Sequence, residues 1–274
     1  MALASVIIPC YNQGLFINET IDSVLSQTFK DFEIIVVNDG STDQFTINII
    51  NALSHPKIKI ITTSNMGLAM ARNNGIKAAQ GTIILPLDSD DIIAPTYLEK
   101  AVPILVGNPS IGLVYSQAYL FGDLHGKSSL PECETAKMVL RNFIINCGHF
   151  RKKDWEICGG YNPNMKYGWE DWDFWLSIIE RGKKVHQIKE PLFHYRIRKK
   201  SMCRSMTLHQ MAEMHTQLFN NHRDFFCANI ATLFEEYYKF SLESQKTIPS
   251  LLCDKFRHPI KTIRSQFIPN KRDI

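Results

Sequence analysis

The first hundred residues alternate short β-branched runs with helical patterns, and this alternation limits the folds that the chain can adopt. The β-branched runs cover residues 5–9, 32–38, 58–62 and 82–87. Apolar residues recur at helical spacing over residues 16–27, 42–53 and 67–79. Runs such as VIIP and EIIVVN are apolar without alternation, which is typical of parallel strands covered by helices on both faces. The sequence therefore predicts a βαβαβαβ unit. Such a unit belongs to an α/β fold with a mostly parallel central sheet flanked by helices.

The pattern is less regular after Pro95. We expect a helix to about residue 106, a strand over 111–121 and a mobile loop over 122–131. A short strand and turn over 147–163 precede a strong helix over 171–181. Two strands over 184–188 and 192–196 follow, and helices over 206–219 and 225–242 would form a C-terminal helical extension.

Composition favours a folded protein without a membrane span. Apolar residues make up 45% of the 274, enough for a sizeable core. No uncharged apolar stretch reaches the roughly 18 residues of a membrane helix, and the N-terminus runs directly into a strand pattern without the layout of a signal peptide. The seven cysteines are scattered without a CxxC pair and are expected to be reduced thiols. We therefore expect a cytoplasmic protein.

The last twenty residues are more basic than the rest of the chain, whose net charge is +4. This tail could contact an anionic membrane surface and place the protein at the inner face of the cell membrane, or it could be a solvated end. The basic residues are Lys255, Arg257, His258, Lys261, Arg264, Lys271 and Arg272.

Polar side chains follow the predicted strands. In an open parallel sheet, ligands collect where the carboxyl ends of the strands meet. These positions hold Pro9, Cys10, Tyr11 and Asn12 after the first run, Asn38, Asp39 and Gly40 after the second, Asn65 and Gly67 after the third, and Asp88, Ser89, Asp90 and Asp91 after the fourth.

The segment LPLDSDD carries two carboxylates, Asp88 and Asp90, on either side of a serine. With oxygens from a diphosphate, they would suit Mg²⁺ or Mn²⁺, and the metal would cancel charge on a leaving group. An aspartate cluster before a helix can also simply cap that helix. Both interpretations stay open on these residues alone.

The segment YGWEDWDFWLSIIERG begins a helix with Glu170 and Asp171, and its apolar residues recur at helical spacing. A carboxylate at the positive end of a helix is expected to stay ionised, and it could accept a proton from an incoming hydroxyl. Capping is the alternative and is compatible with catalysis. Trp169, just before the helix, could stack on a sugar.

His194 lies in LFHYRIR, followed by Arg196, Arg198, Lys199 and Lys200. Among these cations it could be a third metal ligand or a phosphate contact, although a single histidine is usually structural.

Five segments in this order resemble the inverting family 2 glycosyltransferases of the GT-A fold, over roughly residues 4–200. They are SVIIPCYNQ, VVNDGSTD, NMGLAMARNNGI, ILPLDSDD and GWEDWDFWLSI. The resemblance implies a nucleotide-sugar site in a Rossmann-like GT-A domain of residues 1–204. Its nucleotide-binding half would be 1–95 and its acceptor-binding half 96–204, with residues 205–274 as the C-terminal helical extension with its basic tail.

The resemblance also implies a role for each site residue. Pro9, Tyr11 and Asp39 would hold the base, commonly uracil, and Arg72 would face the phosphates or ribose. Asp88 would help to hold the nucleoside, and Asp90 would bind the cation, with Asp88 and His194 as further metal ligands. Asp171 would be the catalytic base, and Glu170 would position the acceptor. The expected donor site is completed by Asn12, Asn65, Gly67 and Ser89.

The implied reaction moves one sugar from a UDP-hexose or UDP-N-acetylhexosamine to a hydroxyl of a glycan on lipid or protein, with inversion and with Mn²⁺ or Mg²⁺. The QxxRW motif of processive relatives is missing, which favours a single addition per encounter. No nucleic-acid partner is expected, and the chain could form a homodimer.

Other functions fit the residues less well. A dehydrogenase would need GxGxxG after its first strand, where this chain has PCYNQG. A nucleotidyltransferase would need a glycine-rich basic loop there. A catalytically degenerate scaffold of the same fold is the remaining alternative, and the intact Asp39, Asp88, Asp90 and Asp171 argue against it.

Overall fold

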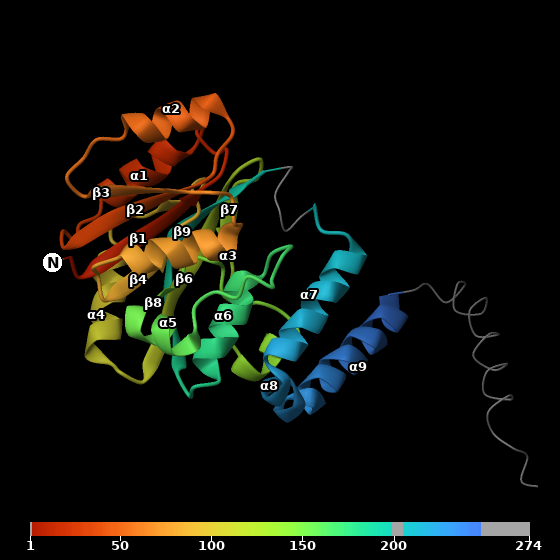
Figure 1. The fold of residues 1–274 in the computed structure, drawn as a ribbon. Helices are drawn as coiled ribbons and strands as arrows, with labels where there is room; N and C mark the ends of the chain where they lie inside the picture. The colour runs from red at the N-terminus through yellow and green to blue at the C-terminus, as the bar shows by residue number, and fades with distance from the viewer. Residues whose placement is uncertain (1, 199–204, 248–274) are drawn as a thin grey trace, which may run out of the picture. The chain divides into compact units, whose positions relative to one another are not determined.

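The computed structural model describes residues 2–198 and 205–247 (Figure 1). Its strands are β1 (Ala4–Cys10), β2 (Phe32–Asp39), β3 (Ile58–Thr63), β4 (Ile83–Pro86), β5 (Ile92–Ile93), β6 (Ile111–Gly122), β7 (Gly126–Ser128), β8 (His149–Arg151) and β9 (Lys184–Ile197). Its helices are α1 (Ile17–Leu25), α2 (Gln44–Ala52), α3 (Leu68–Ala78), α4 (Tyr97–Gly107), the 3₁₀ helix η1 (Thr135–Val139), α5 (Lys152–Cys158), α6 (Glu170–Ile179), α7 (Leu208–Asn221), α8 (Arg223–Ala228) and α9 (Ile230–Thr247).

One sheet runs through the protein in the order β3-β2-β1-β4-β8-β6-β9-β5, with β7 paired to β6. The strands β3, β2, β1 and β4 are parallel, so their carboxyl ends share one edge. β8 is antiparallel to β4 and β6, β9 is parallel to β6, and β5 is antiparallel to β9. The α/β fold with a central sheet, flanking helices and C-terminal helices is confirmed. The sheet is parallel from β3 to β4 and mixed from β4 onward.

The apolar runs form strands because both of their faces are covered. Val6 and Ile34 pack in one core cluster with residues of α1 and α4. Ile7 and Val37, which point to the opposite face, are also fully buried, and α3 covers that face. Figure 1 shows α1 and α2 on one side of β1–β3 and α3 on the other.

Several elements after residue 90 differ from the sequence expectation. The two strands expected over 184–188 and 192–196 are one strand, β9, because a bulge at 189–190 absorbs the irregularity while pairing with β6 resumes at Pro191. The expected loop over 122–131 contains β7, and part of the expected turn after β8 is the helix α5. The two-residue strand β5 has too short a pattern to be recognised.

The chain divides into two compact units, Met1–Cys227 and Ala228–Ile274. The first holds the sheet and α7, which begins with a capping box between Thr207 and Gln210. The second holds α9. The domain boundaries expected at 95 and 204 stay predictions, and the basic tail, Lys199 and Lys200 lie outside the described residues.

No helix in the described ranges is long and apolar enough to cross a membrane. The cysteines within those ranges are free thiols, as expected; Cys203 and Cys253 lie outside them.

Gly75 lets α3 lie close against the sheet. A β-carbon there would lie 2.9 Å from Val37 Cγ2 and closer still to Ile7 Cγ2. Gly75→Ala should therefore lower the free energy of unfolding by about 1–3 kcal/mol, as overpacking does, although alanine favours helix. Urea unfolding measures this. Gly107→Ala in α4, where nothing lies within 4 Å of the added carbon, is the control, and an equal effect in both variants would contradict the close approach.

Candidate functional site

A cavity of about 1150 Å³ lies at the carboxyl ends of β1, β2 and β4. Every site residue expected from the sequence lines it except Asn12 and His194. The expected residues that line it are Pro9, Tyr11, Asp39, Asn65, Gly67, Arg72, Asp88, Ser89, Asp90, Glu170 and Asp171. The fold therefore brings together carboxylates from β2, from the segment after β4 and from α6. The roles assigned to these residues stay predictions.

Asp39 ends β2 and holds the segment that leads into α3. Its Oδ1 accepts hydrogen bonds from the N–H of Met66 at 3.0 Å and the hydroxyl of Thr63 at 3.2 Å, and its Oδ2 accepts one from the N–H of Gly67 at 2.9 Å. Gly67 has a φ of 85°, which glycine adopts without strain. Asp39 thereby fixes Gly67 at the wall of the cavity.

Asn12 lies beside the cavity and stabilises a turn. Its Oδ1 accepts hydrogen bonds from the N–H groups of Thr42 and Asp43, both at 2.9 Å, and its φ of 53° is one that asparagine tolerates. The structure thus gives Asn12 a part in shaping the loop after β2.

Arg72 is 1% exposed and joins two carboxylates from distant parts of the chain. Its Nη2 donates to Asp88 Oδ1 at 2.7 Å, and its Nη1 donates to Glu170 Oε1. Burial alone would lower the pKa of Arg72, but Asp88 and Glu170 outweigh burial and raise that pKa above its ordinary value. Asp88 has a partner on each oxygen, because Asn146 Nδ2 donates to its Oδ2. The contact that the structure shows for Glu170 is therefore with Arg72.

Asp171 lies at the cavity wall in the first turn of α6. Its Oδ1 accepts the N–H of Trp172 at 2.7 Å, and its Oδ2 accepts Nδ2–H of Asn142 at 3.0 Å. Burial and the neighbouring Glu170 raise the pKa of Asp171 to about 7, although Arg72 lowers it. The helix N-terminus does not keep this carboxylate fully ionised at neutral pH, as the sequence suggested, because desolvation is the stronger effect. A pKa near neutrality suits a general base.

Asp90 pairs with Arg198, whose Nη2 lies 2.6 Å from its Oδ2. Burial and Asp88 raise the pKa of Asp90, although Arg198 lowers it. Within residues 2–198 and 205–247, no three His, Cys, Asp or Glu side chains are grouped so that they could hold a metal ion. A divalent cation at Asp90 would therefore need further oxygens, such as those of a diphosphate, and Mg²⁺ sites of one or two carboxylates plus substrate phosphates fit this arrangement.

His194 is not among the residues that line the cavity. Its ring packs against Tyr119, with 5.7 Å between the ring centroids, and burial lowers its pKa. Its backbone pairs with Ile92 of β5. The contacts that the structure shows for His194 are structural, and its place as a metal ligand stays a prediction.

Trp169 precedes α6 with a φ of 66°, a left-handed conformation that is uncommon for a bulky residue, and it lines the cavity. The ring of His215, on α7, meets its indole edge-on at 4.7 Å between centroids and also contacts Trp172. At the other end of α7, Asn221 and His222 both bond Asp173 of α6. α7 therefore packs along the helix that carries Asp171.

Sequence reasoning did not find Asn142, Asn146, His215 or His222. The two asparagines lie in an irregular segment between η1 and β8, and the two histidines lie on or next to a helix that is far from α6 in the sequence. Each contacts a carboxylate or an aromatic ring of the site or of α6 and its C-terminal end only after folding, so no local pattern marks them.

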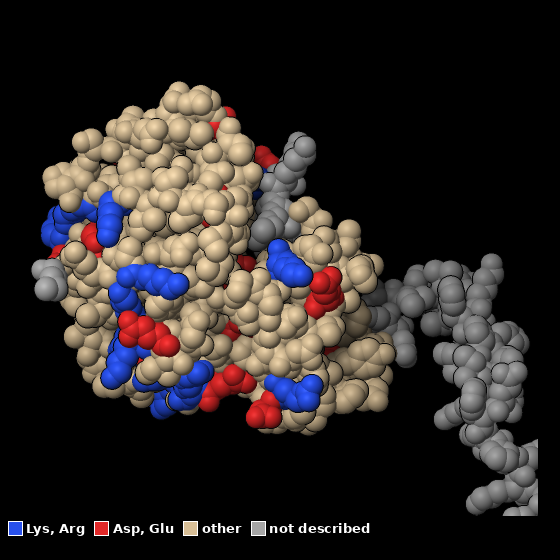
Figure 2. Space-filling view, in the orientation of Figure 1, with Lys and Arg blue, Asp and Glu red and all other residues tan. Residues whose placement is uncertain are grey.

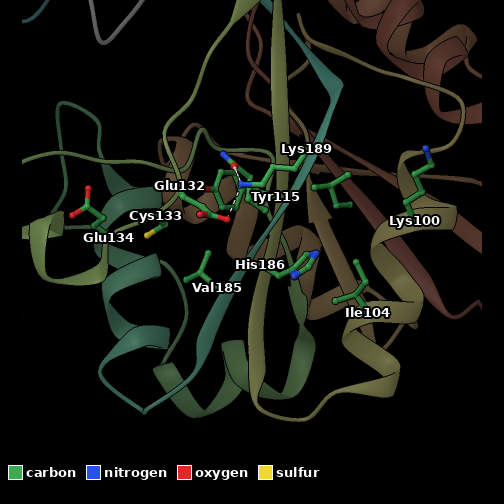
Figure 3. Close-up of a pocket in the computed structure, with 11 residues that line it drawn as sticks. Lys100, Ile104, Tyr115, Glu132, Cys133, Glu134, Val185, His186 and Lys189 are labelled. Carbon is green, nitrogen blue, oxygen red and sulfur yellow. Dashed lines mark hydrogen bonds and ion pairs between the residues drawn. The ribbon is translucent and has the colours of Figure 1, made fainter.

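A second cavity of about 770 Å³ lies between α4, β6, β9 and the segment before η1 (Figure 3). It contains none of the expected site residues. Its charges are partly paired, since Lys189 Nζ lies 2.6 Å from Glu132 Oε1. On the face in Figure 2, basic and acidic side chains lie next to one another rather than in a patch of one sign. The first cavity is therefore the candidate site.

Comparison with known proteins relates this chain to glycosyltransferases. The sequence model described as Glycosyl transferase family 2 matches residues 5–156. An uncharacterized glycosyltransferase of Haemophilus influenzae is 42% identical over 195 residues, which are 67% of this chain and 74% of that protein. Chondroitin synthase of Pasteurella multocida is 31% identical over 190 residues, which are 67% of this chain and 20% of the synthase. The chain thus spans about a fifth of that relative.

Solved structures share the fold. Residues 1–349 of S. aureus TarS in complex with UDP-GlcNAc align with a TM-score of 0.63 and 18% identity, over 82% of this chain and 72% of that one. The mannosyltransferase PcManGT from Pyrobaculum calidifontis in complex with GDP-Man and Mn²⁺ aligns with a TM-score of 0.56 and 18% identity, over 88% and 80% of the two chains.

His222 should make the stability of the protein depend on pH. It is buried, with Nδ1 2.8 Å from Glu180 and Nε2 3.2 Å from Asp173. Burial lowers its pKa, but hydrogen bonds to these two carboxylates outweigh burial and raise the pKa from 6.5 to about 9. A raised folded-state pKa contributes stability that is complete below about pH 6.5 and is lost as pH rises through about 9.

His222→Ala should therefore lower the free energy of unfolding by roughly 3 kcal/mol at pH 6 and by progressively less between pH 6.5 and 9. Denaturant unfolding at several pH values measures this. His209→Ala, an exposed histidine on α7, the helix that ends just before His222, is the matched control. If the His222 variant loses the same unfolding free energy at every pH, His222 is not a charged partner of Asp173 and Glu180.

Proposed function

The chain belongs to glycosyl transferase family 2, and from this premise we propose that it transfers one sugar from a nucleotide sugar to a glycan hydroxyl with inversion and with the help of a divalent cation. The donor in this proposal is a UDP-hexose or UDP-N-acetylhexosamine, and the acceptor is a glycan on lipid or protein. The neighbour that holds UDP-GlcNAc supports the choice of UDP.

The observation that carries the proposal is the convergence of Asp39, Asp88, Asp90 and Asp171 on one cavity. These residues come from three places in the chain, and no shared helix or hairpin would bring them together. A scaffold without activity would gain no stability from four buried or half-buried carboxylates gathered around an open cavity, since removing charge from water is costly. A cavity of about 1150 Å³ is also large enough for a nucleotide sugar.

The donor would lie along the strand ends. In this proposal the base rests near Pro9, Tyr11 and Asp39, where Tyr11 is 44% exposed and can offer its ring. The diphosphate then lies near Asp90 and the arginines at the end of β9. Arg198, already paired with Asp90 at 2.6 Å, is a cation beside the position of the phosphates.

Asp171 would perform the proton transfer. Its ionised carboxylate removes the proton of the acceptor hydroxyl as the hydroxyl oxygen bonds to C1 of the sugar. The bond from C1 to the phosphate oxygen breaks on the opposite face, so the configuration at C1 inverts and the nucleoside diphosphate leaves. A divalent cation at Asp90 would supply charge stabilisation for this leaving group. No covalent enzyme intermediate is involved, and the proton on Asp171 passes to solvent.

A donor screen tests the proposal. The protein is incubated with UDP-glucose, UDP-galactose, UDP-GlcNAc, UDP-GalNAc and, as the alternative base, GDP-mannose, each with Mn²⁺, and released nucleoside diphosphate is measured with and without a mixture of glycan acceptors. The proposal is supported if UDP is released from a UDP-sugar and the acceptors increase that release. Release from GDP-mannose alone would replace the donor, and no release from any donor would favour the degenerate scaffold.

Asp171→Asn should strongly lower turnover while leaving UDP affinity, measured by calorimetry, nearly unchanged. The loss should be at least the roughly 10²- to 10⁴-fold that is typical of a missing general base. In the wild type, kcat/KM should fall about tenfold per pH unit below about pH 7, where Asp171 becomes protonated. Asp31→Asn, an exposed carboxylate outside the cavity, is the control. Turnover of the Asp171 variant at the wild-type rate would remove this residue from the role.

Asp90→Ala should weaken UDP binding only when Mn²⁺ is present. Without a divalent cation, the variant should bind UDP as well as the wild type or better, because one negative charge near the diphosphate is gone. Calorimetry with Mn²⁺ and with EDTA separates the two conditions. If wild-type transfer persists in EDTA, the proposed dependence on metal is wrong. If the variant binds UDP in Mn²⁺ as well as the wild type does, residues other than Asp90 hold the metal.

A further inference from the structure

The segment from 140 to 146 connects the two sides of the cavity. It runs from η1 to β8, and its two asparagines both line the cavity. Asn142 Nδ2 donates to Asp171 Oδ2 at 3.0 Å, and Asn146 Nδ2 donates to Asp88 Oδ2. Two residues four positions apart thus hold one carboxylate at the end of β4 and one at the start of α6.

The orientation of the Asn142 amide is fixed by the backbone of Ile144. Its Oδ1 accepts the N–H of Ile144 at 3.0 Å, so the NH₂ group must be the end that faces Asp171. Phe143 and Ile144 are buried at 3% and 0% exposure, which anchors the turn in the core. The donor is therefore held in place by packing and by a backbone hydrogen bond before any substrate arrives.

The charged groups around Asp171 explain why an added donor matters. Glu170 and Asp88 are like charges that raise its pKa, and Arg72 is the nearby cation that lowers it. Arg72, however, already bonds both Glu170 and Asp88. Among the described residues, the direct hydrogen bond from a side chain of another segment to Asp171 comes from Asn142. A hydrogen bond to the ionised form of a carboxylate favours that form.

We infer that Asn142 is a positioning residue for the sugar transfer: its amide holds Oδ2 of Asp171 and stabilises the ionised carboxylate that accepts the proton. The inference rests on the proposed role of Asp171 as base. Asn142 bonds Asp171 in this scheme and does not itself exchange a proton. Losing it leaves the cavity and the donor contacts in place but makes the base harder to ionise.

The test is an NMR titration of protein labelled with ¹³C at the aspartate side-chain carboxyl carbon. The resonance of Asp171 is identified by its absence in Asp171→Asn. Asn142→Ala should raise the titration midpoint of this resonance by roughly one pH unit, since a hydrogen bond to a charged group is lost. Asn142→Asp should raise it further, because a like charge replaces the donor. Asn164→Ala, whose amide bonds Asn221 instead, is the matched control and should leave the midpoint unchanged.

An unchanged midpoint in both Asn142 variants would overturn the inference. Unchanged UDP affinity in each variant shows that the fold and donor site survive. With the donor identified by the screen, the acid limb of kcat/KM in Asn142→Ala should move to higher pH by the same amount as the NMR midpoint. If Asp171→Asn retains turnover, the proposed base is wrong whatever the NMR shows, so the two failures are distinguishable.

Discussion

The site depends on the two ion pairs that the buried guanidinium of Arg72 makes. Arg72 lies on α3, among the residues that the βαβ unit places beside the sheet, and it bonds Asp88 after β4 and Glu170 at the start of α6. A buried cation with two anions is costly to separate, because removal of one partner leaves an uncompensated charge in the interior. This triad therefore fixes α6 against the parallel strands that carry the candidate site. Since Asp171 is the next residue after Glu170, the same contact sets where the proposed base stands.

The chemistry of Asp171 follows from how α6 is held. Trp169, in a left-handed conformation, leads the chain into the helix. Glu170 and Asp171 then line the cavity, while Trp172 and Trp175 are buried in the core. Burial in the first turn of α6 moves the pKa of Asp171 toward neutrality. α7 supports the arrangement from outside through His215 and His222. Residues beyond the segment matched by the family model thus stabilise the helix of the proposed base.

The strand ends could be predicted from the sequence, and the contacts between distant segments could not. Asp39, Asp88 and Asp90 follow apolar runs whose parallel pairing places them at one edge, and the structure confirms this edge. Asp171 could be placed only through the resemblance to a family, because its helix is far away in the sequence. Asn142 and Asn146 lie in an irregular segment, where position is set by packing rather than by a periodic pattern. The sequence also predicts two strands where the structure has only β9, because the bulge that joins them has no clear sequence signal.

A structure of the protein with UDP and Mn²⁺ tests the central claim most directly. The account predicts that the uracil lies near Asp39, that the diphosphate and the cation lie at Asp90, and that the carboxylate of Asp171 faces the open end of the cavity beside the β-phosphate. UDP bound in another cavity, or an Asp171 carboxylate turned away from the bound diphosphate, would contradict it.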